Sequence, residues 1–395
     1  MDALGVETPT VTPRATEHMD EMIALIDILM EKGFAYAVDG DVYFAVNKFR
    51  KYGSLSGRNL DEMLAGARVD VNDSKKNPAD FALWKAAKEG EPYWESPWGK
   101  GRPGWHIECS AMSRRYLGDT FDIHGGGEDL IFPHHENEIA QSQAATGKTP
   151  ANYWMHNGFV KVNSEKMSKS MGNIFPIREI LKNCHPEVLR LFMLQSHYRS
   201  PVDYSASSLG ETRSALIRCY STLQLLKEIP GSLTVDNTAA PGNDKFQARQ
   251  KVYAGKIREL MEKFDAALDD DFNTAQGLGC VFDAVRLTNN FIAAEKNMIA
   301  AGTSTAVAEA GKAFGHFASI LGILQDDPAH FFLTDKEMES RKRDLNTAEI
   351  ESLIRARQEA RMAKDWARAD EIRSKLAGLN IVLKDSQDGT TWSIE

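Results

Sequence analysis

Side chains that could ligate a metal ion are concentrated in one part of this sequence. Five of the ten histidines lie between His106 and His156. Within this stretch, Trp105–Cys109 reads WHIEC and Pro133–Glu138 reads PHHENE. Sulfur, nitrogen and oxygen donors of these types are the ligands that zinc takes in proteins. The stretch is therefore the first place to look for a metal site.

His134 and Glu138 are the best spaced pair for such a site. On a helix, residues four apart face the same way about one turn apart, and Cys109 adds a distant thiolate. Three protein ligands describe a catalytic or substrate-binding zinc, whereas a structural zinc takes four. The spacing alone fits an ordinary helix-surface pair even better, with Cys109 as a small buried apolar residue.

A segment rich in lysine and serine indicates a second kind of chemistry. Lys166–Asn173 reads KMSKSMGN and follows an extended segment, Gly158–Val162. Two lysines that bracket a serine, followed by Gly-Asn, make a basic loop that could close over an anion. Such a loop could neutralise charge on a transferred phosphoryl group. A solvated turn is the alternative, because lysine and serine are mostly exposed in proteins.

The overall composition is that of a globular protein of two or three domains. The 395 residues are 42% apolar and 26% charged, which argues against disorder, collagen-like repeats and coiled-coil fibres. No apolar run has the length of a membrane span, and the N-terminus lacks the pattern of a signal peptide. The net charge of −9 argues against an indiscriminate nucleic-acid binder. We expect a cytoplasmic protein, and the four scattered cysteines fit a reducing compartment.

Hydrophobic periodicity places the first half of the chain in mixed structure. Apolar spacing from Thr16 predicts a helix that stops at Gly33. Asp39-Gly40 between two apolar runs predicts a hairpin. Residues 47–104 read as irregular, and 105–177 as an α/β region whose first helix begins near Trp105.

The second half of the chain reads as nearly all helical. The predicted helices are 186–196, 206–228, 244–268, 272–296, 304–324 and 347–377. Residues 230–244 and 325–345 read as connectors. Leu379–Val382 and Thr390–Ser393 read as a terminal hairpin, and Asn273 or Asp271 is expected to cap the helix that follows.

Several strings together carry a family resemblance. Lys166, Met167, Ser168, Lys169 and Ser170 spell KMSKS, the second signature of class I aminoacyl-tRNA synthetases. The surrounding strings GRPGWHIEC (101–109), FDIHGGG (121–127) and FPHHENE (132–138) closely resemble the cysteinyl-tRNA synthetase family. The resemblance extends over essentially the whole chain.

This resemblance implies an α/β plus α fold. A partial class I Rossmann-type catalytic domain would be followed by a helical bundle and a small C-terminal anticodon-binding module. The implied domains are 1–104 (end of the first Rossmann half and connective insertion), 105–177 (second Rossmann half with the zinc site and KMSKS loop), 178–240 (stem-contact helices), 241–330 (tRNA-binding bundle) and 331–395 (anticodon recognition).

The resemblance also implies a ligase that activates cysteine with ATP and Mg²⁺ and transfers it to tRNA(Cys). One Zn²⁺ would be held by Cys109, His134, Glu138 and a further cysteine, and would prefer the substrate thiolate to the hydroxyl of serine. Trp105 and His124 would line the cysteine pocket, although a packed aromatic and an ordinary buried histidine fit them almost as well.

For the ATP site, the resemblance implies that Asp129 contacts the ribose. Lys169, with Lys166, would stabilise the phosphates. The family's first signature, a His-Ile-Gly-His-type string at a helix N-terminus, has no match in the 395 residues. We therefore expect the chain to begin after that part of the family sequence, to have an incomplete parallel sheet, and to show little pyrophosphate exchange alone.

The end of the chain is mildly basic. Residues 341–375 hold ten Lys and Arg against seven Asp and Glu, which fits a tRNA contact and, equally, a solvated helix. Trp392 fits core packing better than base stacking. The resemblance suggests a monomer.

Two other functions remain open at this point. A related enzyme could join cysteine to a small amino-sugar conjugate, but the extension 330–395 argues against so small an acceptor. A non-catalytic tRNA-binding derivative would have no need of the KMSKS loop or of zinc ligands.

Overall fold

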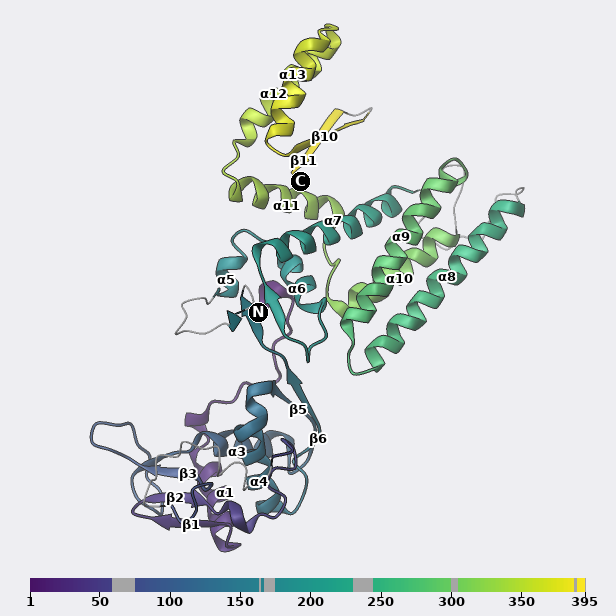
Figure 1. Cartoon of the computed structure of the whole chain (residues 1–395). Helices are drawn as coiled ribbons and strands as arrows, with labels where there is room; N and C mark the ends of the chain where they lie inside the picture. The colour runs from purple at the N-terminus through teal and green to yellow at the C-terminus, as the bar shows by residue number, and fades with distance from the viewer. Residues whose placement is uncertain are drawn as a thin grey trace. The chain divides into compact units, whose positions relative to one another are not determined.

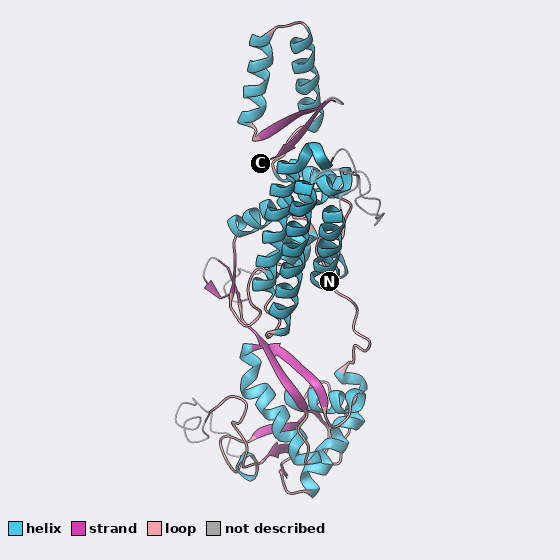
Figure 2. Ribbon diagram, turned by 90° about the vertical axis from the view of Figure 1, so that its right-hand side faces the viewer, coloured by secondary structure: helices cyan, strands magenta, loops and turns pink. Residues whose placement is uncertain are grey.

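The computed structural model describes residues 1–58, 75–162, 165–166, 175–229, 244–299, 305–386 and 389–394. The chain divides into two compact units (Figure 1). We call the first, Thr8–Phe159 with Arg199–Pro201, the sheet unit, and the second, Met1–Glu7, Val160–Tyr198 and Val202–Glu395, the helical unit. Figure 2 shows most of the long strands in the sheet unit and mainly helices in the helical unit. The finer domain limits given above remain predictions.

The sheet unit alternates helices and strands. Its elements are α1 (Met19–Glu31), β1 (Ala35–Val38), β2 (Asp41–Phe44), β3 (Phe81–Ala86), β4 (Gly101–Pro103), α3 (Trp105–Leu117), β5 (Phe121–Gly127), α4 (Glu136–Thr146) and β6 (Ala151–Asn157).

The first helix and hairpin are confirmed. Helix α1 ends at Glu31, and Gly33 follows with a φ of 75°. At the hairpin turn Asp39 has a φ of 52° and Gly40 a φ of 87°, the left-handed conformations that a two-residue turn requires.

The prediction that 47–104 is irregular is wrong for two of its segments. Strand β3 pairs antiparallel with β2 on one side and with β4 on the other, which completes a sheet of order β1-β2-β3-β4. Leu83 and Trp84 of β3 are fully buried. The strands that pair with β3 lie far from it in sequence. Because this stretch is rich in Gly, Pro and Trp, its local pattern does not predict a strand.

One hydrophobic core joins this sheet to three helices. Met22, Ile26 and Leu29 of α1 pack with Ile107 and Ala111 of α3. Helix α4 contributes only alanines, Ala140, Ala144 and Ala145. Because alanine side chains are short, α3 and α4 approach each other closely, which brings their polar faces together as well.

Among the described residues, parallel pairing joins β5 to β6 and, in the helical unit, β7 to β9. Strands β5 and β6 run in register from Phe121↔Ala151 to Gly127↔Asn157, with α4 between them in sequence. Ligands of open α/β sheets bind beyond the carboxyl ends of such strands, which here means beyond Gly127 and Asn157.

The helical unit begins with short elements and continues in long helices. Its elements are β7 (Val160–Val162), β8 (Glu165–Lys166), α5 (Ile177–Ile180), α6 (Pro186–Leu194), β9 (Val202–Tyr204), α7 (Ala206–Glu228), α8 (Asp244–Asp269), α9 (Thr274–Ile299), α10 (Thr305–Leu321), α11 (Pro328–Lys342), α12 (Thr347–Met362), α13 (Trp366–Gly378), β10 (Ile381–Ser386) and β11 (Gly389–Ile394).

Helices α7 to α10 pack around a large core that includes Tyr220, Phe264, Phe314 and Phe317 (Figure 1). Asn273 caps α9, since its Oδ1 accepts a hydrogen bond from the Gln276 N–H at 3.0 Å. None of the helices in the described ranges is both long and apolar enough to cross a membrane.

Two predictions about the end of the chain need correction. The expected connector 325–345 contains helix α11, which starts at Pro328 behind an Asp327 cap. The expected single helix 347–377 is two, because Lys364 has a φ of 60° and interrupts it. The terminal hairpin is confirmed as β10–β11, and Trp392 is buried in a small core with Ile354 and Leu376.

Replacing Gly104 with alanine should destabilise the sheet unit. Gly104 immediately precedes α3, and a Cβ there would lie 2.0 Å from the carbonyl oxygen of Ala82. Overpacking of this kind costs about 1–3 kcal/mol. We expect a lower urea midpoint for G104A by circular dichroism.

The matched control is Gly210→Ala, because a Cβ at Gly210 in α7 meets nothing within 4 Å. Equal midpoints for the two variants would show that the approach of β3 to the start of α3 is not tight.

Candidate functional site

The ends of α3 and α4 form the centre of the site. Gln141 of α4 ties the two helices together, because its Nε2 donates to the His106 carbonyl oxygen at 3.0 Å and to Ser110 Oγ at 2.9 Å. The N-terminal part of α4 is buried although it is polar: Glu136, Asn137, Glu138 and Gln141 are all inaccessible. Buried polar groups at this density require partners, and those partners define the site.

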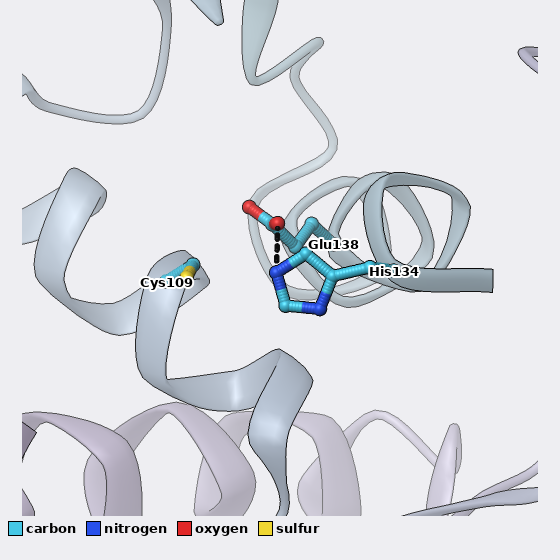
Figure 3. A group of neighbouring side chains, drawn as sticks. All are labelled: Cys109, His134 and Glu138. Carbon is cyan, nitrogen blue, oxygen red and sulfur yellow. Dashed lines mark ion pairs between the residues drawn. The ribbon is translucent and has the colours of Figure 1, made fainter. Parts of the chain in front are cut away.

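Cys109, His134 and Glu138 lie together. Their ligand atoms are all within 4.8 Å of one another. Figure 3 shows Cys109 on one helix facing His134 and Glu138, which come from the neighbouring segment. His134 Nε2 lies 2.9 Å from Glu138 Oε1. The i,i+4 pairing expected from the sequence is therefore present, and it is buried rather than on a helix surface.

The geometry of this trio suits a cation better than a hydrogen bond. Within the described part of the chain, Glu138 Oε1 is buried and accepts no well-directed hydrogen bond, although His134 Nε2 is close. This carboxylate oxygen, the imidazole nitrogen of His134 and the sulfur of Cys109 therefore direct their lone pairs toward one another. Residues of these types fit a zinc ion.

Aromatic and histidine rings surround the trio. His106 Nδ1 lies 2.7 Å from His134 Nδ1, so one of these rings donates to the other. The Trp105 ring packs against the His134 ring with centroids 4.3 Å apart and an interplanar angle of 32°. Trp105 is nevertheless 59% exposed to solvent. Trp105 therefore forms an open wall beside the candidate metal ligands.

On its other side Glu138 meets a second group of histidines. His124 Nε2 of β5 lies 3.4 Å from Glu138 Oε2, and the His124 ring packs on His135 and Trp154. His135 Nδ1 is 2.8 Å from His156 Nε2 of β6. His124, His135 and Glu138 also form a ligand group of their own.

Burial lowers the pKa of two of these histidines in particular. It lowers the pKa of His106 to about 4, with the nearby His134 ring as a second cause. It lowers the pKa of His135 to about 3, helped by His124, His156 and His134. Burial, followed by the Glu138 and Glu108 carboxylates, raises the pKa of the Cys109 thiol to about 12. A bound cation would favour the thiolate instead.

Glu136 anchors a neighbouring loop to the start of α4. Its fully buried carboxylate accepts hydrogen bonds from the Gly53 N–H at 2.9 Å, the Leu55 N–H at 3.2 Å, and both the N–H and the hydroxyl of Ser56 at 2.9 Å. The adjacent Asn137 Oδ1 accepts from the Tyr52 hydroxyl. These bonds fix the segment that carries His134 and Glu138.

Two glycines at the carboxyl end of β5 lie close to neighbouring side chains, and an exposed carboxylate follows the strand. A Cβ at Gly126 would lie 2.8 Å from the His135 ring, and one at Gly127 would lie 2.5 Å from Asp129 Oδ1. Asp129 itself is exposed beyond the strand end. At Gly126 the absence of a side chain leaves room for the His135 ring.

The KMSKS string falls largely outside the described residues. Lys166 is the last residue of β8, where its backbone pairs with Lys161 of β7. Met167, Ser168, Lys169 and Ser170 lie outside the described residues, so their expected roles remain predictions.

The structure thus brings together Cys109, His134 and Glu138, with Trp105 and His124 at their sides. Sequence reasoning gave no role to His106, His135, His156 or the aromatic Trp154. The density of histidines between 106 and 156 was a usable signal, but it did not show which of them meet.

Three family models match successive parts of the chain. Residues 1–214 match the model for the tRNA synthetases class I (C) catalytic domain. Residues 263–325 match the DALR domain, and residues 344–392 match the cysteinyl-tRNA ligase anticodon binding domain.

The fold agrees with the first of these matches. The structure is similar to Mycobacterium tuberculosis methionyl-tRNA synthetase in complex with methionyl-adenylate, with a TM-score of 0.52, 13% identity, and coverage of 81% of this chain and 74% of that one. Fold and site together define a class I aminoacyl-tRNA synthetase.

Sequence relatives identify the family within this class. The chain is 52% identical to the cysteine–tRNA ligase of Geobacter sulfurreducens and 51% identical to that of Pelobacter propionicus. The matches cover 100% of this chain and 79% and 80% of those proteins. The chain belongs to the cysteine–tRNA ligase family.

Changing Glu136 to glutamine should destabilise the site without touching a candidate ligand. The glutamine NH₂ would face backbone N–H donors, and hydrogen bonds to a charged group contribute about 1.5–3 kcal/mol each. We expect E136Q to lower the free energy of unfolding by at least 2 kcal/mol. Glu128→Gln, at an exposed position, is the control, and a loss of equal size in both variants would contradict an anchoring role for Glu136.

Proposed function

We propose that this chain is a cysteine–tRNA ligase. The 52% identity with the Geobacter sulfurreducens enzyme over 395 residues carries the proposal. In the first step the cysteine carboxylate attacks the α-phosphate of ATP, which forms cysteinyl-adenylate and releases pyrophosphate. In the second, the 3′-terminal hydroxyl of tRNA(Cys) takes the cysteinyl group and AMP leaves. Both steps depend on positioning and charge stabilisation.

We further propose that Cys109, His134 and Glu138 hold one zinc ion. The orphaned Glu138 Oε1 and the convergence of sulfur, nitrogen and oxygen donors support this. Zinc, when bound, would supply a soft cation that prefers a thiolate to a hydroxyl, and thus cysteine to serine. His106 would hold the His134 ring in place through its 2.7 Å contact.

We propose roles for the other predicted site residues from their positions in the fold and in the sequence. Trp105 is an exposed wall next to His134, and His124 contacts Glu138, so both border the place where a substrate thiol would lie. Asp129 follows the carboxyl end of β5, where nucleotides bind in open α/β sheets. Lys166 and Lys169 would neutralise the phosphates of ATP, which enters with Mg²⁺.

The two other functions are not favoured. The match of residues 344–392 to an anticodon binding domain has no use in an enzyme with a small amino-sugar acceptor. A tRNA-binding protein without catalysis would not need the buried zinc ligands. Because charging of tRNA serves translation, we also propose a cytoplasmic location and, as the family resemblance suggests, a monomer.

Cys109→Ala should remove the zinc. Mutating a residue that only hydrogen-bonds to a metal ligand lowers metal affinity by about 10- to 100-fold. Removing the ligand itself should lower zinc affinity at least as much. We expect about one zinc per parent chain and little in C109A by elemental analysis after dialysis. The control is Cys184→Ala, since Cys184 is partly buried in the helical unit. Equal zinc in both variants would exclude Cys109 from the site.

The function itself is tested with labelled amino acids. With ATP and tRNA(Cys), we expect at most slow charging, because the 395 residues hold no match to the family's first signature, and any acid-precipitable label should come from cysteine and not from serine. Filter binding separates recognition from chemistry, and tRNA(Cys) should be retained in preference to other tRNAs. Equal retention of all tRNAs, or equal label from serine, would contradict the proposal.

A further inference from the structure

Glu108 carries a partly buried carboxylate at the edge of the site. It lies on α3, about one helical turn after Trp105 and directly before Cys109. Within the described ranges, Glu108 makes no ion pair and no side-chain hydrogen bond with another residue. Its neighbour along α4, Glu136, shows the contrast, because that carboxylate is surrounded by donors. A carboxylate that folding partly withdraws from water, without a cation or donors beside it, is typical of a functional site.

The charge of Glu108 acts on two of the three candidate metal ligands. Burial raises the pKa of Glu108, and the His134 ring opposes this rise. Burial, Glu138 and Glu108, in that order, raise the pKa of the Cys109 thiol. The Glu108 carboxylate is therefore close to the point at which Cys109, His134 and Glu138 converge.

The charges in this part of the site leave room for one cation. Zn²⁺ with one thiolate, one carboxylate and one imidazole as ligands has no net charge, because metal-bound imidazole is neutral. A substrate thiolate then adds one negative charge, and Glu108 adds another. The positive charge that cysteine itself brings is its ammonium group, so an ammonium beside Glu108 would restore the balance.

Trp105 offers a second surface that suits an ammonium group. Tryptophan is the aromatic side chain that attracts cations most strongly to its ring. The Trp105 side chain is exposed and packs beside His134. Because Trp105 and Glu108 are three residues apart on a helix, they are neighbours on one side of α3. An exposed indole next to a carboxylate favours a cationic group over an anionic one.

We propose that Glu108 binds the ammonium group of the substrate cysteine, with Trp105 beside it. The ammonium and the thiol of cysteine are carried by neighbouring carbons. A carboxylate that pairs with the ammonium must therefore lie close to the ligands of the metal that takes the thiolate, and Glu108 adjoins one of them, Cys109. The inference rests on the proposed function. It adds a residue that selects thiols with a neighbouring ammonium over thiols without one.

The test compares three thiols that differ in their charged groups. Cysteine has an ammonium and a carboxylate, cysteamine lacks the carboxylate, and β-mercaptopropionate lacks the ammonium. Binding of each thiol to the zinc-loaded chain is measured by calorimetry for the parent and for Glu108→Gln. Loss of a hydrogen bond to a charged group corresponds to about 10- to 100-fold in affinity. E108Q should lose this much affinity for cysteine and cysteamine, and should bind β-mercaptopropionate as the parent does.

Glu89→Gln is the matched control, because it removes an exposed carboxylate between β3 and β4 of the sheet unit. This variant should bind all three thiols as the parent does. Elemental analysis should find the parent zinc content in E108Q, and thermal unfolding checks that both variants stay folded.

The outcomes separate this inference from the proposed function. If the parent prefers cysteine to β-mercaptopropionate and E108Q does so equally, Glu108 does not bind the ammonium. Equal losses for cysteine and β-mercaptopropionate, or loss of zinc from E108Q, would also overturn the inference, since Glu108 would then support the metal. If the zinc-loaded parent binds no cysteine at all, the proposed function is wrong and the inference falls with it.

Discussion

The burial of the polar N-terminal end of α4 is the constraint on which the sheet unit depends. A carboxylate without solvent is costly unless donors surround it, and Glu136 obtains its donors from the loop at Gly53–Ser56. Gln141, one helical turn further on, reaches α3. The polar end of one helix thus fixes both the loop before it and the helix beside it. The alanines of α4 make this possible, since they leave room for α3 to approach.

The same helix end separates structural from functional polar groups. The Glu136 carboxylate and the Asn137 side-chain oxygen accept hydrogen bonds from within the protein. Glu138, two residues on, has an oxygen that none of the described residues satisfies well, and it faces Cys109 and His134. Burial lowers the pKa values of His106 and His135, whose rings pack against His134. The unsatisfied group therefore marks the site, and the satisfied ones hold it still.

Helix α7 of the helical unit also carries both structurally committed and exposed charged side chains. Arg213 is committed to Asp335 and to the last strand, and so joins α7 to the C-terminal hairpin. Arg218, on the same helix, is exposed. Helix α7 therefore serves both as a support for the C-terminal module and as one wall of a charged groove.

The sequence by itself determined the helices with strong periodicity, the Asp39-Gly40 hairpin and the i,i+4 relation of His134 and Glu138, and it narrowed the cap before α9 to Asn273 or Asp271, because these features depend on residues close in the chain. It also carried the family strings. Only the tertiary structure decided that β3 and β4 complete a sheet, that Lys364 divides the last long helix, and that His106, His135 and His156 join the ring cluster. Cys109 meets His134 only because buried alanines and hydrogen bonds align α3 with α4. Such contacts between distant segments depend on packing, and no local pattern encodes them.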